Sequence, residues 1–132
     1  MISDHELLNY ARQAQATESY APYSRFYVGA AILTENQKIF TSGNIENASF
    51  GLSVCAERIA VFKAIGAGER ELLAIAVTAQ STGYTYPCGA CLQVLSEFAP
   101  EIKVIVTNEN NQYRQYYLKQ LLPYSFLWQQ ED

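Results

Sequence analysis

Leu72-Leu73-Ala74-Ile75-Ala76-Val77 is a continuous apolar run near the middle of the 132-residue chain. Its length and composition predict a buried strand over 72–79. An alanine-rich segment at 54–67 precedes this strand and a second segment at 87–98 follows it, and both favour helices that glycine or proline ends. Residues 102–107 predict another strand. Strands that alternate with helices in this way lie parallel in one sheet, with the helices packed on the sheet.

The remaining elements flank this central part. Ser3 and Glu6 fit a capping box at the start of an N-terminal helix, and Glu35-Asn36-Gln37 separates the two strands of a hairpin. Because a hairpin is antiparallel, we expect an α/β fold with a mixed sheet. We find no internal repeat or linker, so we expect a single domain, residues 1–132. These outer elements are expected at 3–18 (helix), 26–33 and 38–41 (strands), 112–116 (edge strand) and 117–122 (short helix).

Composition excludes several classes of partner. The chain is 49% hydrophobic and 17% charged, which is typical of a compact globular protein. No apolar run is long enough to cross a bilayer, and the N-terminus has no secretory signal. We therefore expect a cytoplasmic protein with no membrane partner. The net charge of −4, with lysines and arginines scattered, disfavours nucleic acid and favours a small-molecule substrate.

Three cysteines and one glutamate are the candidate catalytic groups. Cys55-Ala56-Glu57 and Pro87-Cys88-Gly89-Ala90-Cys91 fall at the starts of the two central helices. Thiolate pKa values fall at helix N-termini and beside a metal. Three thiolates can hold a zinc ion and leave one tetrahedral position open. An open position takes water, whose pKa zinc lowers to about 7.

The combined pattern matches the signature of zinc-dependent nucleobase deaminases, in which cysteine can replace the histidine ligand. In this interpretation the zinc-bound hydroxide attacks C4 of a cytosine ring. Glu57 shuttles protons to N3 and helps to expel ammonia, which requires a pKa raised by burial. Arg58 follows Glu57 and is expected to hydrogen-bond sulfur, offsetting the excess negative charge of three thiolates around zinc.

Each part of the pattern has a simpler interpretation. A Cys-x-x-Cys pair alone could be a redox pair or half of a structural zinc site, and a helical Cys-Ala-Glu alone is most often a buried cysteine beside a surface carboxylate. A four-cysteine site is excluded because the chain has three cysteines. His5, the only histidine, is expected to be a solvated helix residue and not a ligand.

Six short motifs occur in a fixed order along nearly the whole chain. They are Ala21-Pro22-Tyr23-Ser24-Arg25-Phe26, Val28-Gly29-Ala30-Ala31, Asn44-Ile45-Glu46-Asn47-Ala48-Ser49-Phe50, Cys55-Ala56-Glu57-Arg58, Pro87-Cys88-Gly89-Ala90-Cys91 and Leu121-Leu122-Pro123-Tyr124-Ser125-Phe126. In this series the chain resembles the small, homotetrameric cytidine deaminases of nucleoside salvage.

The resemblance implies a three-layer α/β/α sandwich around a five-stranded mixed sheet. It also implies hydrolysis of cytidine and deoxycytidine to uridine and deoxyuridine, with one zinc per subunit. Its ligands would be Cys55, Cys88 and Cys91, with Glu57 as the proton shuttle. Further roles follow from the resemblance: Phe26 stacks on the pyrimidine, Asn44 and Glu46 hydrogen-bond the ribose 3′-hydroxyl, the Ala56 backbone reads the base edge, and neighbouring subunits contribute Ala48, Phe50 and Phe126.

From the residues alone, these binding roles have alternatives. Asn44 and Glu46 are equally good loop-turn residues, although an amide and a carboxylate one residue apart can converge on a hydroxyl. Phe26 opens the expected strand at 26–33, where a core position is the commoner interpretation. Phe126 and Trp128 favour either core or interface positions.

The chain departs from the family pattern at two positions. Leu92 follows Cys91 where the family usually carries arginine, which leaves open how the charge of the thiolate cluster is balanced. Phe50 stands where tyrosine is common, so a hydroxyl contact is missing there. Neither departure changes an expected zinc ligand or Glu57.

Three other functions compete with a deaminase of free cytidine. The first is deamination of another aminopyrimidine nucleoside, such as a blasticidin-type antibiotic, against which the pair Asn44 and Glu46 argues. The second is a non-catalytic, zinc-stabilised interaction module, disfavoured by the open ligand position and Glu57. The third is nucleic-acid editing, disfavoured by the net charge.

Overall fold

The structure is a computed structural model that describes residues 1–128. Residue 132, the expected end of the domain, lies outside the described residues. The elements in chain order are α1 (Asp4–Thr17), β1 (Val28–Thr34), β2 (Ile39–Gly43), the 3₁₀ turn η1 (Phe50–Leu52), α2 (Ala56–Gly66), β3 (Leu72–Ala79), α3 (Gly89–Phe98), β4 (Lys103–Thr107), β5 (Tyr113–Tyr117) and α4 (Leu118–Leu121).

The strands form one five-stranded sheet in the order β2-β1-β3-β4-β5. The central pair β3 and β4 is parallel, because α3 crosses over between them. The β1–β2, β1–β3 and β4–β5 pairs are antiparallel. The expected mixed sheet with a parallel centre is therefore confirmed. No helix within residues 1–128 is long and apolar enough to cross a membrane.

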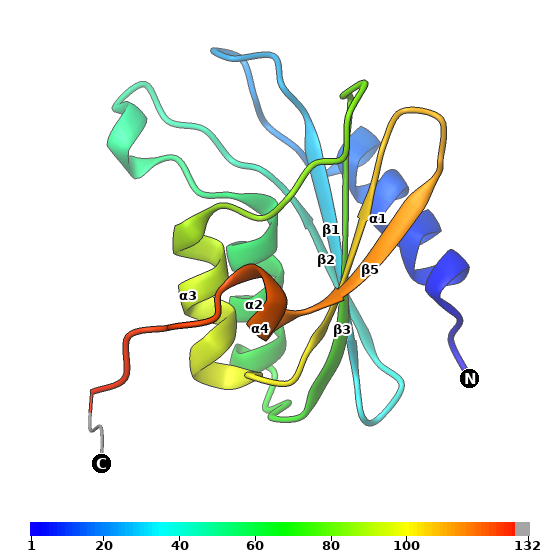
Figure 1. Cartoon of the computed structure of the whole chain (residues 1–132). Helices are drawn as coiled ribbons and strands as arrows, with labels where there is room; N and C mark the ends of the chain where they lie inside the picture. Colours follow the sequence, from blue (N-terminus) through cyan, green and yellow to red (C-terminus); the bar gives the residue numbers. More distant parts are fainter. Residues whose placement is uncertain (129–132) are drawn as a thin grey trace.

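Helices cover both faces of the sheet, so the three-layer sandwich is confirmed. On one face α1 packs against alternate residues of the strands, such as Ala31, Ala76 and Ile105. On the other face α2, α3 and α4 pack against the intervening strand residues, such as Ile32 and Val77. Figure 1 shows α1 alone on one side of the sheet and the three other helices on the opposite side.

The N-terminal helix begins as the sequence predicts. The Ser3 Oγ accepts a hydrogen bond from the Glu6 N–H at 3.1 Å, and the Glu6 side chain accepts from the Ser3 N–H. This capping box satisfies N–H groups that have no partner within the helix. His5 is exposed in the first turn.

Gly29 allows α1 to pack closely on β1. A Cβ atom at this position would lie 2.0 Å from the Ala11 carbonyl oxygen and 2.6 Å from the Gln15 backbone nitrogen. Both are backbone atoms, so rotation of a side chain cannot relieve the overlap, and the helix would have to move away from the sheet.

We expect Gly29→Ala to lower the free energy of unfolding by on the order of 3 kcal/mol, the upper range for overpacking a core. Urea denaturation followed by circular dichroism measures this change. Gly83→Ala is the matched control, because a Cβ at Gly83 meets no atom of the described residues within 4 Å. Equal stability of the two variants would contradict the close approach of α1.

Most boundaries differ from the sequence prediction by one or two residues, and the structure explains three of these differences. β1 begins at Val28 and not at residue 26, because the Phe26 backbone bonds to side chains: its N–H donates to Ser24 Oγ at 3.0 Å and its carbonyl accepts from Asn44 Nδ2 at 2.8 Å. β2 extends to Gly43, which pairs with Gly29. α3 begins at Gly89 with Cys88 as its N-cap, so Pro87 precedes the helix instead of lying in its first turn.

Candidate metal centre and active site

The three cysteine sulfurs gather where α2 and α3 begin. Cys55 is the N-cap of α2 and Cys88 the N-cap of α3, and Cys91 lies in the first turn of α3. The Sγ atoms are 3.9 Å apart for Cys55 and Cys88 and 3.5 Å apart for Cys88 and Cys91, and all three lie within 4.8 Å of one another. Tetrahedral zinc with bonds of about 2.3 Å places its sulfur ligands about 3.8 Å apart, so the cluster fits zinc.

The surroundings of the cluster favour thiolates. Both helices direct N-terminal N–H groups and the positive end of the helix dipole towards the sulfurs. The Arg58 guanidinium donates to the Cys55 Sγ at 3.7 Å. Hydrogen bonding from Cys91, reinforced by Arg58, lowers the pKa of Cys55 to about 5. One cation next to three thiolates and a divalent metal would bring the local sum of charges to zero.

Glu57 is a buried carboxyl group beside the sulfurs. Its side chain is 4% exposed, and its Oε1 atom has no hydrogen-bond partner within the described residues. Burial raises the pKa of Glu57 to about 7. A buried polar atom without a partner costs stability unless something else satisfies it. The unpartnered Oε1 atom therefore indicates that a ligand completes the site. The raised pKa of the Glu57 carboxyl group suits a residue that both accepts and donates protons near neutrality.

A cavity of about 270 Å³ connects these groups with the loops that follow β2 and β3. The sequence-predicted residues that line it are Phe26, Asn44, Glu46, Cys55, Ala56, Glu57 and Cys88. The fold thus brings together residues from four separate segments of the chain. Sequence reasoning missed Ser24, Val28, Thr85 and Tyr86, which complete the lining. The sequence offered one signal for these residues: Ser24 and Val28 lie close to Phe26, and Thr85 and Tyr86 lie close to Cys88.

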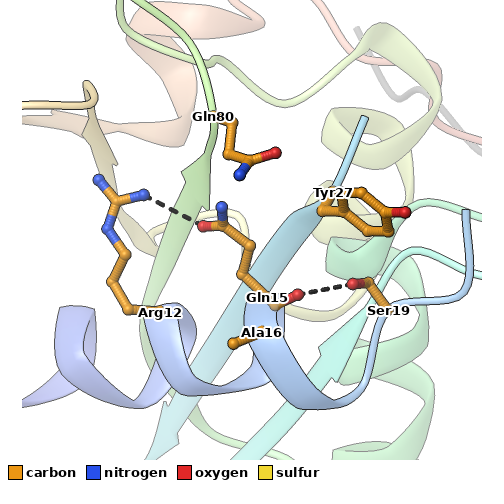
Figure 2. Close-up of a pocket in the computed structure, with 6 residues that line it drawn as sticks. All are labelled: Arg12, Gln15, Ala16, Ser19, Tyr27 and Gln80. Carbon is orange, nitrogen blue, oxygen red and sulfur yellow. Dashed lines mark hydrogen bonds between the residues drawn. The ribbon is translucent and has the colours of Figure 1, made fainter. Parts of the chain in front are cut away.

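Alternation along the chain decides which side chains enter the cavity. Phe26 and Val28 line it, whereas Tyr27 between them points to the opposite face of the sheet. There Tyr27 lines a second cavity of about 330 Å³ together with residues of α1. Figure 2 shows that cavity, with Arg12 donating to Gln15 and with Ser19, Tyr27 and Gln80 around it. Among residues 1–128, no cysteine and no carboxylate lines this second cavity, so the candidate chemistry belongs to the first cavity.

Asn44 and Glu46 already hold the loops around the cavity. The Asn44 Oδ1 accepts from the Val28 N–H at 2.9 Å, in addition to the bond from its amide to Phe26. The Glu46 Oε1 accepts from the N–H groups of Tyr23 and Ser24 at 3.0 and 3.1 Å, and its Oε2 accepts from the Ser24 hydroxyl. Both side chains keep hydrogen-bonding capacity towards the cavity, since each oxygen has more than one lone pair and the amide has a second N–H.

Three predicted binding residues lie outside the cavity of their own chain. Ala48 is exposed in the loop before η1. Phe50 is 73% exposed, with its ring centroid 5.9 Å from that of Tyr23. Phe126 is 66% exposed. Its backbone N–H and carbonyl form two hydrogen bonds with the Gln93 amide, at 3.0 and 2.9 Å. Gln93, to which the sequence analysis assigns no role, thus fixes the C-terminal segment against α3.

Leu92 packs into the core. It is buried against the strands on the α2 and α3 face of the sheet. Its side chain therefore contributes apolar packing and adds no charge near the sulfurs. Trp128 is exposed, which excludes a core position within the described chain.

Comparison with known proteins agrees with this geometry. A family model described as the cytidine and deoxycytidylate deaminase zinc-binding region matches residues 1–108. The chain belongs to this family. Zinc is accordingly its cofactor, and the three-cysteine cluster offers a fitting set of ligand atoms.

Relatives and solved structures in this deaminase family cover most of the chain. A cytidine deaminase of Halalkalibacterium halodurans is 46% identical over 114 residues, which are 85% of this chain and 86% of the relative. A probable cytidine deaminase of Dictyostelium discoideum is 40% identical and covers 99% of this chain and 89% of its own. The crystal structure of cytidine deaminase from Burkholderia pseudomallei superposes with a TM-score of 0.90 at 45% identity, covering 94% of this chain and 99% of that one.

Proposed function

We propose that this protein, as a single domain of residues 1–132, deaminates cytidine and deoxycytidine hydrolytically to uridine and deoxyuridine and releases ammonia. The observation that carries the proposal is the buried Glu57 carboxyl, whose Oε1 has no hydrogen-bond partner within the described residues, beside a cluster of three thiols. Glu57 and two of these cysteines, Cys55 and Cys88, line one cavity. A carboxyl group that is neutral or charged with nearly equal ease can move a proton in both directions. We assign Cys55, Cys88 and Cys91 as the ligands of one zinc per subunit.

The residues of the site divide the chemistry between them. When bound, zinc supplies the polarised water for attack on C4 of the cytosine ring. Glu57 would take one proton from that water and deliver it to ring nitrogen N3 as the water oxygen bonds to C4. It would then take the remaining proton of this oxygen and deliver it to the amino group, which leaves as ammonia when the C4–N bond breaks. Arg58 holds the Cys55 sulfur and offsets its charge. The overall reaction balances as nucleoside plus water giving the keto product plus ammonia.

Other lining residues would bind the nucleoside. Phe26 would stack on the pyrimidine, the Ala56 backbone at the first position of α2 would read the base edge, and Asn44 with Glu46 would bind the ribose 3′-hydroxyl. The hydrogen bonds that Asn44 and Glu46 make within the chain support these roles, because they fix both side chains before substrate arrives. Binding by groups that are already ordered costs less conformational entropy.

Asn44→Asp should raise the KM for cytidine about 10-fold, the effect of one unsatisfied hydrogen bond, and change kcat less. The substitution removes the amide that donates to the Phe26 carbonyl, which displaces the ring that would stack on the base. Steady-state kinetics on the zinc-loaded enzyme measure both constants. Asn9→Asp, on the exposed face of α1, is the control. A fall in kcat at unchanged KM would contradict a role in binding.

We also place the protein in a homotetramer with shared active sites and without nucleic-acid or membrane partners. Phe50 and Phe126 are strongly exposed, which suits contacts with neighbouring subunits that complete each pocket. The double hydrogen bond from Gln93 supports this role for Phe126, since it fixes the backbone while leaving the ring outward. Free thiols at all three cysteines suit the reducing cytoplasm.

A shared site predicts that two impaired variants rescue each other. Phe126→Ala and Glu57→Gln subunits should each have low activity alone, and mixed tetramers should regain part of the activity because some sites then contain both native residues. The measurement is cytidine turnover after the variants are unfolded together and refolded. Sedimentation gives the subunit number. Activity that merely averages the two separate preparations would contradict sharing.

Incubation with cytidine tests the proposed function itself. Ammonia release and a shift of the ultraviolet spectrum towards uridine are expected, with the same for deoxycytidine. A zinc-replete protein inert towards both nucleosides would refute it. A strong preference for a blasticidin-type antibiotic in the same substrate panel would reassign the substrate. Tight, salt-sensitive binding of single-stranded nucleic acid would indicate editing.

A further inference from the structure

Tyr86 lines the substrate cavity from the side of the metal site. It is 42% exposed and lies two residues before Cys88, with Pro87 between them. The proline fixes its own φ and restrains the preceding residue to extended conformations. The lining of the cavity includes Asn44 and Glu46, which would take the ribose, and it also includes Tyr86 together with Cys88, a proposed metal ligand near which C4 would react.

The loop that carries Tyr86 is fastened to the β4–β5 hairpin. The Glu109 N–H donates to the Ser81 carbonyl at 2.9 Å, and the Thr85 N–H donates to the Thr107 carbonyl at 3.3 Å. These bonds tie the start of the loop to the turn after β4 and the end of the loop to the last residue of β4. The backbone of the loop therefore has a defined path to the N-cap of α3.

The Tyr86 ring has its own partners on the edge strand β5. Its hydroxyl lies 2.8 Å from the Tyr116 hydroxyl, and the two ring centroids are 5.6 Å apart at an interplanar angle of 57°. The Arg114 guanidinium carbon stands 4.3 Å from the centroid of the Tyr84 ring. Interaction with the hydroxyls of Tyr86 and Tyr116 raises the pKa of Arg114.

Arg114 and Tyr116 act from one face of β5. They are alternate residues and project to the same side of the strand. Gln115 between them bonds to Asp4 of α1 on the opposite side of the sheet. Tyr113, two residues before Gln115, shares that opposite side and is therefore not part of the group around Tyr86. The strand thus supplies a natural control residue of the same type.

We infer that Tyr86 is a specificity-determining wall of the deaminase pocket and that Tyr116 is a positioning residue that holds its ring. The inference rests on the proposed function of this cavity. Glu57 must approach N3, which is one ring neighbour of C4. The wall on the Cys88 side then borders the other neighbour, C5. The Tyr86 ring limits the size of the group that a pyrimidine nucleoside can carry at C5.

Substrate selectivity tests the wall. The readout is the ratio of kcat/KM for 5-methylcytidine to that for cytidine. Tyr86→Ala should raise this ratio about 10-fold, since one methyl group in an apolar pocket is worth 10-fold or more. Tyr116→Phe should raise the KM for cytidine about 3-fold and leave kcat nearly unchanged, because it removes the hydroxyl contact that holds the ring. Tyr113→Phe should match the native enzyme in every constant.

Product binding separates this inference from the proposed function. Calorimetry of the zinc-loaded protein with uridine and 5-methyluridine gives the same selectivity without turnover, and Tyr86→Ala should again favour the methylated nucleoside about 10-fold. Thermal melting confirms that each variant is folded. If the native protein turns over cytidine but Tyr86→Ala leaves the ratio of methylated to unmethylated nucleoside unchanged, the inference about Tyr86 is wrong and the proposed function stands. Absence of binding by either nucleoside overturns both.

Discussion

Glu57→Gln should lose turnover by about 10²- to 10⁴-fold, the range for removal of a general acid–base group, while it keeps its zinc. The glutamine amide occupies nearly the same volume as the carboxyl group, so the buried site retains its packing. It can neither accept the proton of the attacking water nor deliver one to N3. The measurement is kcat for cytidine alongside the zinc content of the same preparation.

The control for this variant is Glu97→Gln on the exposed side of α3. This substitution makes the same change of charge in α3, the helix that begins at the cysteine cluster, and it should leave both kcat and zinc content at native values. If Glu57→Gln retained native turnover, Glu57 would have no part in the reaction. If it lost zinc together with activity, its role would be structural support of the ligands.

Cys88→Ser should lose both zinc and activity. The Cys88 Sγ lies 3.9 Å from that of Cys55 and 3.5 Å from that of Cys91, so its removal leaves only two thiols of the three-ligand cluster. Outer partners of metal ligands alone are worth about 10- to 100-fold in affinity, and we expect the loss of a ligand to exceed about 100-fold. Competition with a chromogenic chelator measures the zinc affinity.

The thermal stability of this variant should also become independent of zinc. A metal that binds only the folded chain stabilises it in proportion to the logarithm of its concentration over Kd. Zinc should therefore raise the Tm of the native protein and of Glu57→Gln, and chelation should reverse the rise. Cys88→Ser should melt at the same temperature with and without zinc. A native zinc-dependent shift in Cys88→Ser would remove this cysteine from the ligand set.

Much of the fold follows from local patterns. The apolar run at 72–77 and the capping box at Ser3 and Glu6 depend on residues close in sequence, so the strand β3 and the start of α1 were predictable. The start of β1 was not, because Asn44 reaches back from another segment and bonds to the Phe26 backbone. Contacts of this kind depend on tertiary structure that no local pattern encodes.

The candidate site divides in the same way. The cysteines and Glu57 form a compact pattern with few alternatives, and helix starts bring their side chains to one point. The Tyr86 wall depends on a tyrosine 30 residues later on an edge strand, and the Gln93 contact with Phe126 joins residues 33 apart. The environment of Leu92 also needed the structure, since only the packing shows that it faces the core.

The most direct test is zinc analysis and a cytidine assay on one sample of the native protein. We expect one zinc per chain and stoichiometric release of ammonia and uridine, both lost on chelation and both restored when zinc returns. Protein that deaminates cytidine at full rate after complete removal of metal, or that holds one zinc per chain and leaves cytidine unchanged, would contradict a zinc-dependent deaminase.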